Sequence, residues 1–384
     1  GRSLPDGTYT AAEAEWLTGA GAVVVDRYRG TYGENQIVLT VPDGATQTLE
    51  EALADHNAAE GTAYTFDALN GGDLKDWTLV KRGAGTLRLV STNANFVGTV
   101  HLEAGVADVV ARYGLGKGTA DAGPIYVHAG ATMLCTHPEP SKETDFRNGN
   151  RTVHVAGTGV DGTGALRGTG GFIAYGTRPV FGREIVLDDD ALVVQGTWYC
   201  PANVLTLNGY TLTLKGAKAG DPVHFNKVQG DGRLVLDGCQ ARQTPVEFTS
   251  AAPGNVVEFR NGGGFRFWSS EGTKWPAAGP WPFAFTGVTT YLFGDQGVSR
   301  EQGVNTLTGP VQVGGTLWQH SQGNTAYSAV FLQGPVSGEG VIAVASPNNE
   351  NNYFHLLNPA NTFTGGVRVQ RGLLCVYEDG SLPP

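Results

Sequence analysis

The stretch NTFTGGVRVQRGLLCV, residues 361–376, carries the pattern that decides the fold. A turn-forming Thr-Gly-Gly leads into the alternating triplet Val367, Arg368 and Val369, and Gly372 then precedes a second apolar run. Alternation with a period of two is typical of a β-strand that buries one face. By itself the stretch fits either a local hairpin or one rung of a repeating structure, so its recurrence along the chain decides between them.

The same pattern recurs at three other places. NTLTGPVQVGGTLW at 305–318 matches almost position for position, while ANFVGTVHLEAGVA at 94–107 and GPIYVHAGATMLC at 123–135 keep the glycines and the apolar alternation. The pattern predicts equivalent pairs of core residues, each with an outward-facing residue between its two members. The pairs are Val367/Val369, Val311/Val313, Val100/Leu102 and Ile125/Val127, and the outward residues are Arg368, Gln312, His101 and Tyr126.

Glycine makes up 57 of the 384 residues and charged residues only 16%, a composition that favours many short strands joined by tight turns. The recurrences lie 25 residues apart (Gly98 and Gly123) and 56 apart (Gly309 and Gly365), which fits about one and about two coils of a solenoid. We therefore predict an all-β fold, a right-handed parallel β-helix (β-solenoid), formed by residues 1–384 as a single domain. A β-sandwich is the alternative fold, but sandwiches rarely reach this length. They also do not require this sequence pattern, here called the cassette, to recur.

One segment departs from the strand pattern. TQTLEEALADHNAAEG, residues 46–61, predicts a short helical insertion, with Thr48 and Glu51 at the spacing of a capping box. Leu49, Ala52 and Leu53 lie on one face of that helix and would pack on a coil or cover an exposed edge.

Charge and cysteine usage exclude several classes of partner. The net charge is −10 without a Lys/Arg cluster, so we expect no nucleic-acid partner, because phosphate-binding grooves are basic. No apolar run approaches the ~20 residues that cross a bilayer, so we expect no membrane insertion by this segment. Cys135, Cys200, Cys239 and Cys375 are widely separated, and we expect buried thiols, no metal site and no cofactor. The opening GRSLPDGTYT carries no secretion signal and is expected to be the edge of a longer, processed chain.

The segment WTLVKRGAGTLRLVSTNANFVGTVHLEAG, residues 77–105, resembles the passenger-associated β-strand repeat of bacterial autotransporters and related giant surface proteins. The Lys-x-Gly-x-Gly-Thr-Leu phrase of that family is matched by Lys81, Gly83, Gly85, Thr86 and Leu87, and its Asn-Thr-Phe-Thr-Gly-Gly turn by residues 361–366, followed by Val369, Gly372 and Leu374. The resemblance implies a right-handed parallel β-helix on a secreted or outer-membrane-exposed bacterial protein. It implies little about activity, because fold does not determine function.

Familiar catalytic signatures are absent: the chain has no HExxH, no GxSxG and no phosphate-binding loop. Asp188, Asp189 and Asp190 lie between two strand-like runs and are interpreted as a solvated loop, since a carboxylate pair must converge across a groove to act on a glycosidic bond. His101 and His128 occupy outward positions of strand cassettes, where solvent-facing roles are expected. We predict no catalytic residues.

An aromatic-rich loop at 262–285 interrupts the cassettes. It holds Trp268, Trp275 and Trp281, with the polar residues Arg266, Glu271 and Lys274 beside them. Exposed indole rings offer flat apolar faces to sugars, and the polar residues would bond hydroxyl groups, so this set is a candidate ligand-binding site for glycan or protein. The alternative is that the loop folds over the solenoid with its aromatic rings packed inward.

Together these observations predict a non-enzymatic β-helical passenger segment of a bacterial secreted or surface protein, acting as a scaffold with an adhesive or glycan-binding face. The expected partners are a glycan or a host or bacterial surface protein, together with neighbouring coils of the same parent chain. The alternative is a polysaccharide-acting enzyme, a lyase or glycoside hydrolase, whose carboxylates line a groove on the β-helix.

Overall fold

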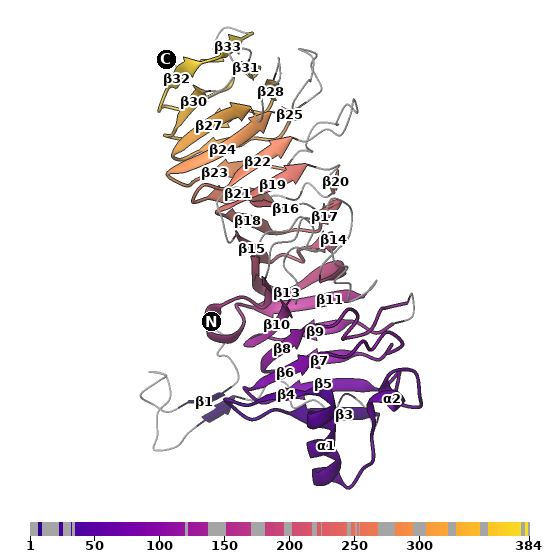
Figure 1. Cartoon of the computed structure of the whole chain (residues 1–384). Helices are drawn as coiled ribbons and strands as arrows, with labels where there is room; N and C mark the ends of the chain where they lie inside the picture. The colour runs from indigo at the N-terminus through magenta and orange to yellow at the C-terminus, as the bar shows by residue number, and fades with distance from the viewer. Residues whose placement is uncertain are drawn as a thin grey trace. The chain divides into compact units, whose positions relative to one another are not determined.

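The computed structural model describes residues 7–9, 23–25, 32, 35–119, 122–136, 151–169, 181–195, 202–216, 221–223, 225–243, 247–249, 252, 254–267, 281–294, 305–321, 328–345, 352–377 and 381–382. The chain divides into two compact units, Gly1–Pro138 with Phe146–Gly168 and Glu139–Asp145 with Thr169–Pro384. In each unit short parallel strands stack coil upon coil (Figure 1). The predicted parallel β-helix is confirmed, whereas a single domain over residues 1–384 stays a prediction.

The first unit has two parallel faces, to each of which every coil contributes one strand. The first face contains β3 (Gln36–Thr40), β5 (Thr78–Arg82), β7 (Val100–Leu102), β9 (Ile125–Val127) and β11 (Thr152–Gly157). The second contains β4 (Thr46–Thr48), β6 (Thr86–Leu89), β8 (Gly105–Val109), β10 (Ala131–Thr136) and β12 (Leu166–Thr169). A 3₁₀ helix, η1 (Val160–Gly162), precedes β12, and β1 (Gly7–Tyr9) pairs antiparallel with β2 (Val23–Val25).

The interior of this unit is built from columns of apolar side chains. Leu79 pairs with Val100, Val100 with Ile125, and Ile125 with Val153, so these residues stack one above another. Each is at most 2% exposed. The predicted core pairs Val100/Leu102 and Ile125/Val127 are therefore confirmed. Adjacent parallel strands lie about 4.8 Å apart, and a buried aliphatic side chain contributes roughly 1.5–3 kcal/mol, so the columns hold coil to coil.

The predicted helical insertion is α1 (Leu49–Glu60), followed by α2 (Phe66–Leu69). The Thr48 side chain accepts a hydrogen bond from the Glu51 amide, and the Glu51 carboxylate accepts one from the Thr48 amide, which confirms the capping box. Leu49, Ala52 and Leu53 are each 2% exposed and form the buried face. Gly61 ends the helix in the left-handed conformation.

The second unit also consists of parallel strands stacked in faces. One face runs through β14 (Ala202–Thr206), β17 (Lys227–Gln229) and β20 (Glu247–Phe248). The next contains β15 (Thr211–Gly216), β18 (Arg233–Asp237), β21 (Val256–Arg260), β23 (Phe283–Phe285), β26 (Val311–Val313) and β29 (Val336–Ser337). A further face contains β16 (Asp221–Val223), β19 (Cys239–Gln243), β22 (Gly264–Phe267), β24 (Thr289–Gly294), β27 (Thr316–Ser321), β30 (Val341–Ala345) and β32 (Val367–Arg371). The last contains β25 (Thr306–Leu307), β28 (Ser328–Leu332), β31 (Asn352–Leu356) and β33 (Leu373–Val376).

The three consecutive aspartates are exposed as predicted, but they do not form a loop. They lie inside β13 (Gly182–Gln195), whose first half pairs with β14 and whose second half pairs with β15. The strand thus passes from one face to the next at 188–190. The Asp190 carboxylate accepts a hydrogen bond from the Thr211 amide over 2.7 Å, which ties this crossing to the next coil.

The stretch at 361–376 is a rung, but its register differs from the predicted one. Val311 pairs with Val336, whereas Val367 pairs with Ile342, and Ile342 pairs with Leu317 on the neighbouring face. One coil here spans 25 residues (311 to 336, and 342 to 367), so a separation of 56 residues is two coils plus six. Six residues is also the step from Val311 to Leu317, which is why the motif moves one face onward.

Val369 is also more exposed than predicted. Its side chain is 48% exposed instead of facing a continuous core, while Arg368 is exposed as expected. The reason is that β32 pairs with β30 on one side, and within the described residues no strand pairs with its other edge.

Several buried positions of the second unit carry polar side chains, and Gln319 is one of them. Gln319 is 0% exposed in β27, between its strand neighbours Leu292 and Val344, and neither its amide nitrogen nor its oxygen has a hydrogen-bond partner. Burying an unsatisfied amide costs several kcal/mol.

We therefore expect Gln319→Met, which keeps the length of the side chain, to stabilise the second unit by about 1–2 kcal/mol. Denaturant unfolding followed by hydrogen exchange of β27 and β30 measures this effect. Gln312→Met on the exposed side of β26 is the control and should have no effect. A destabilised Gln319→Met chain would show that the amide is satisfied in solution.

The described cysteines behave as small apolar residues, with no disulfide among Cys135, Cys239 and Cys375. Cys135 and Cys239 are buried and Cys375 is half-buried, while Cys200 lies outside the described residues. Burial, with the neighbouring Asp108 charge, raises the pKa of Cys135 to about 12, so this thiol is unreactive at neutral pH.

Candidate functional site

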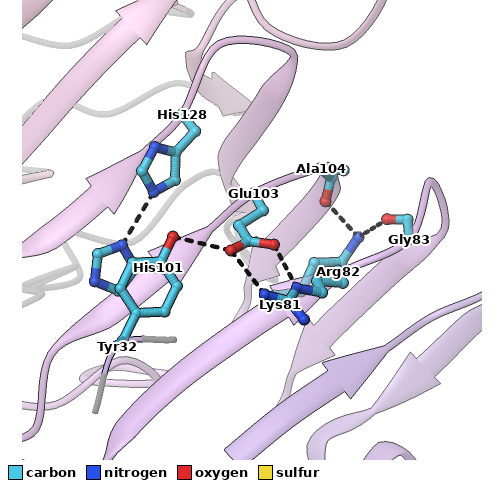
Figure 2. Close-up of polar contacts among 8 residues, drawn as sticks. All are labelled: Tyr32, Lys81, Arg82, Gly83, His101, Glu103, Ala104 and His128. Carbon is cyan, nitrogen blue, oxygen red and sulfur yellow. Dashed lines mark hydrogen bonds and ion pairs between the residues drawn. The ribbon is translucent and has the colours of Figure 1, made fainter. Parts of the chain in front are cut away.

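Arg82 at the end of β5 and Glu103 just after β7 form a polar cluster with Tyr32 (Figure 2). The Tyr32 hydroxyl donates to Oε1 of Glu103 over 2.9 Å. The Arg82 guanidinium contacts the same carboxylate twice, with Nε 2.5 Å from Oε2 and Nη2 3.3 Å from Oε1. Glu103 is only 8% exposed, so its charge and that of Arg82 compensate each other in a shielded position.

Two histidines lie next to this cluster and share a hydrogen bond. Nδ1 of His101 is 3.0 Å from Nε2 of His128, the ring centroids are 5.3 Å apart, and the ring planes differ by 13°. The rings therefore lie nearly edge to edge, so one nitrogen donates and the other accepts. Burial and the charge of His128 lower the pKa of His101 to about 3. His101 is thus neutral at physiological pH.

His101 faces outward as predicted, but it is not solvent-facing, because only 8% of it is exposed. Its ring stacks on Tyr32 at 3.6 Å on one side and Tyr126 at 4.6 Å, and Tyr126 stacks on His154 at 4.6 Å. These rings follow the strand register, since His101 pairs with Tyr126 and Tyr126 with His154. The facing sides of these rings cover one another, so a sugar ring cannot stack between them.

A cavity of about 720 Å³ lies beside the cluster, between α1 and the outer surface of β3. This volume is within the range of ligand-binding pockets. Arg82 lines both the cavity and the polar cluster and so connects them. The other lining residues are Gln36, Val38 and Thr40 of β3, Ala52, Asp55, His56, Ala59 and Glu60 of α1, and Thr62 and Tyr64 of the following loop.

The loop that closes the cavity is fixed by Asn57. Its side-chain oxygen accepts from the Thr62 hydroxyl and the Tyr64 amide, and its Nδ2 donates to the Tyr64 carbonyl, all within 2.8 Å. The Tyr64 ring stacks against His56 at 5.6 Å and meets Trp77 edge-on at 5.5 Å. His56 Nδ1 lies 2.9 Å from the carbonyl oxygen of Val38 and donates to it. The cavity walls are therefore preorganised.

A second charged cluster, in the other unit, has a structural role. Glu258 is 3% exposed and binds Arg260, Arg233 and the Thr286 hydroxyl. Burial opposes its ionisation, but the hydrogen bonds from these three partners outweigh burial and lower the pKa of Glu258 to about 2. Because the two arginines hold Glu258 ionised, it cannot supply the proton that glycoside hydrolysis requires from an acid.

Lys81 explains the glycine-rich phrase of β5 and β6. Its side chain turns inward, is 0% exposed, and donates to the carbonyl oxygens of Gly83 (2.6 Å), Gly85 (2.5 Å) and Ala104 (2.7 Å). Ala104 belongs to the next coil, so the ammonium group joins two coils. Gly105 has φ +65°, and a Cβ there would lie 2.3 Å from Nζ of Lys81. The space for the lysine side chain therefore depends on the glycines around it.

The comparison with protein families matches the segment that contains Lys81 and these glycines. Residues 79–106 match the family model of the passenger-associated-transport-repeat. This segment is similar to a passenger-associated-transport repeat. The repeat supplies β5 to β7, their turns and the start of β8, and it implies a secreted or surface-exposed autotransporter passenger protein. No curated protein and no solved structure matches the chain. Within the described residues no helix is long and apolar enough to span a membrane.

The ligand-binding residues predicted in the loop 262–285 are only partly placed. Trp281 is 0% exposed, so its ring is packed in the core and is not available to a ligand in this conformation. Arg266 belongs to β22, but its side chain is not described, and Trp268, Glu271, Lys274 and Trp275 lie outside the described residues. Ligand binding by those residues stays a prediction.

The cavity next to the repeat was not predicted. The helical insertion at 46–61 marked the place, because it interrupts the strand pattern, but its exposed face was not considered as a site. Asp55, His56 and Glu60 all lie on that helix. The one signal that identifies them is spacing: His56 and Glu60 continue the stripe of Leu49 and Leu53 along α1, at steps of three and four residues, but are polar.

Proposed function

We propose that this chain is a β-helical passenger segment that acts as a scaffold and binds a glycan in the cavity beneath α1. The observation that supports the glycan-binding role is the preorganised 720 Å³ cavity, in which carboxylates, an imidazole, threonine hydroxyls and Tyr64 converge. Such a mixture of polar groups and one aromatic side chain suits the hydroxyl groups and apolar faces of a saccharide.

A cavity-filling substitution tests this role. Ala59 lines the cavity on the exposed side of α1, and Ala59→Trp is expected to reduce glycan binding at least tenfold without lowering the melting temperature. Ala58→Trp is the matched control, because Ala58 is exposed on the same helix but does not line the cavity. The measurement is a glycan array with both variants and the wild-type chain. Wild-type protein that binds no glycan, or equal binding by both variants, contradicts the proposal.

The alternative, a polysaccharide-acting enzyme, is favoured by one observation: Asp55 and Glu60 line the same cavity. Glycoside hydrolysis requires two carboxyl groups on opposite sides of the bond, whereas these two belong to one wall of the cavity, the helix α1. Product analysis after incubation with each glycan that binds distinguishes the two functions. New reducing ends or unsaturated products that disappear in Glu60→Gln identify an enzyme.

A further inference from the structure

The charges around the cavity beneath α1 indicate which saccharides it selects. Asp55 and Glu60 contribute two negative charges to the lining, and Arg82 contributes the one permanent positive charge. That positive charge is already compensated, because the Arg82 guanidinium contacts both carboxylate oxygens of Glu103. The four groups together carry a net charge of −2, so the cavity repels an anionic ligand.

Hydrogen-bonding capacity points in the same direction. The Oε1 atom of Gln36, a lining residue, is buried and has no hydrogen-bond partner. His56 donates through Nδ1 to Val38, so in the neutral ring Nε2 is an acceptor. With the carboxylates of Asp55 and Glu60, the cavity offers an excess of acceptors. A ligand that satisfies them must be rich in donors and, given the net charge, positively charged.

We propose that the cavity selects a saccharide that bears a free amino group, such as an oligomer of glucosamine, over neutral and acidic saccharides. This inference rests on the proposed glycan-binding function. The ammonium group of the sugar binds between Asp55 and Glu60, and its hydroxyl groups bond to Gln36 and the threonine hydroxyls. An ammonium group has three donors and no acceptor, which complements this acceptor-rich lining.

Calorimetric titration with three matched oligosaccharides tests the selection: glucosamine, N-acetylglucosamine and galacturonic acid oligomers of equal length. The glucosamine oligomer is expected to bind most tightly. Asp55→Asn and Glu60→Gln should each weaken its binding about fivefold to tenfold and leave the N-acetylated oligomer unaffected, because each removes a charge from a partly enclosed site. Asp67→Asn, at an exposed acidic residue of α2 outside the cavity, is the control variant.

The possible outcomes separate this inference from the function on which it rests. Tighter binding of the acidic oligomer, or equal binding of all three by wild type and both variants, overturns the selection of amino sugars but retains glycan binding. No binding of any saccharide overturns the proposed function itself. Asp55 also accepts a hydrogen bond from Gln47 over 2.5 Å, so its substitution removes a contact within the fold. Unchanged melting temperatures of the variants exclude unfolding as the cause of weaker binding.

Discussion

Replacing Lys81 by methionine lowers the stability of the coils around β5 to β8 by about 2–3 kcal/mol. The methionine fills the same space but removes the donor from the carbonyl oxygens of Gly83 and Ala104, whereas the Gly85 carbonyl still accepts from the Val106 amide. An unsatisfied buried carbonyl costs about 1–3 kcal/mol. Removing the ammonium group recovers part of this loss, because burial disfavours the charge and lowers the pKa of Lys81 to about 7. Two unsatisfied carbonyl oxygens outweigh one desolvated charge, so the net effect is destabilising.

Hydrogen exchange is the appropriate measurement, because two compact units need not unfold in one transition. Exchange of the Val106 amide, which donates to the Gly85 carbonyl, is expected to become about fiftyfold faster in Lys81→Met. Lys75→Met, at an exposed lysine just before β5, should leave exchange unchanged. Unchanged protection in Lys81→Met contradicts the idea that the ammonium group joins the coils.

This role of Lys81 gives the repeat a physical meaning that its sequence does not reveal. The resemblance implied a strand at the Lys-x-Gly-x-Gly-Thr-Leu phrase, and the structure has the strands β5 and β6 there. A lysine in an alternating strand normally faces solvent. Here the glycines leave space beneath the turn, and the side chain enters it. Arg151 behaves similarly: it is 1% exposed and donates to the carbonyl oxygens of Leu115, Gly98 and Gly123.

Sequence alone predicted the features that depend on local periodicity. Alternation within a cassette correctly predicted the buried pairs of β7 and β9, and the capping box correctly predicted α1. The prediction failed where the face on which a strand lies depends on the number of residues in the preceding coils. A coil of 25 residues in the second unit places Val367 one face away from Val311, although their local sequences agree. Local similarity identifies a strand but does not specify its face.

The candidate site was beyond such reasoning, because it combines residues that are distant in sequence. Tyr32 precedes Glu103 by 71 positions and yet donates to its carboxylate, and Arg82 joins this pair to a cavity formed by α1. Outward positions of a β-helix were assumed to be solvated. Tyr32, which lies outside the coils, covers one such position, so the outward-facing His101 is buried.

The burial of His101 leads to the second large effect, a loss of stability in mild acid. Its pKa is about 3 in the folded chain and about 6.5 in an unfolded one. Between these values the unfolded state binds a proton that the folded state does not, so stability decreases as the pH falls below 6.5. The slope approaches 1.36 kcal/mol per pH unit below the unfolded pKa, so the first unit is expected to lose about 2.3 kcal/mol between pH 6.5 and pH 4.5. The groups around His101 do not prevent this loss, because the Glu103 carboxylate is already bound by Arg82 and Tyr32.

Replacing His101 by phenylalanine tests this account, because the phenylalanine ring preserves the stack between Tyr32 and Tyr126 but cannot bind a proton. The stability of His101→Phe at pH 7 changes through the lost hydrogen bond to His128, so the informative quantity is the difference in stability between pH 6.5 and pH 4.5. Denaturant unfolding, with hydrogen exchange of β7 and β9, should show that this difference shrinks by about 2.3 kcal/mol. His154→Phe, which removes an imidazole from the same column but leaves the His101–His128 bond in place, is the control and should retain the acid sensitivity of the wild type. An equal loss of stability in His101→Phe and wild type would mean that His101 takes up its proton without unfolding, and that the bond between the two imidazoles opens while the coils remain stacked.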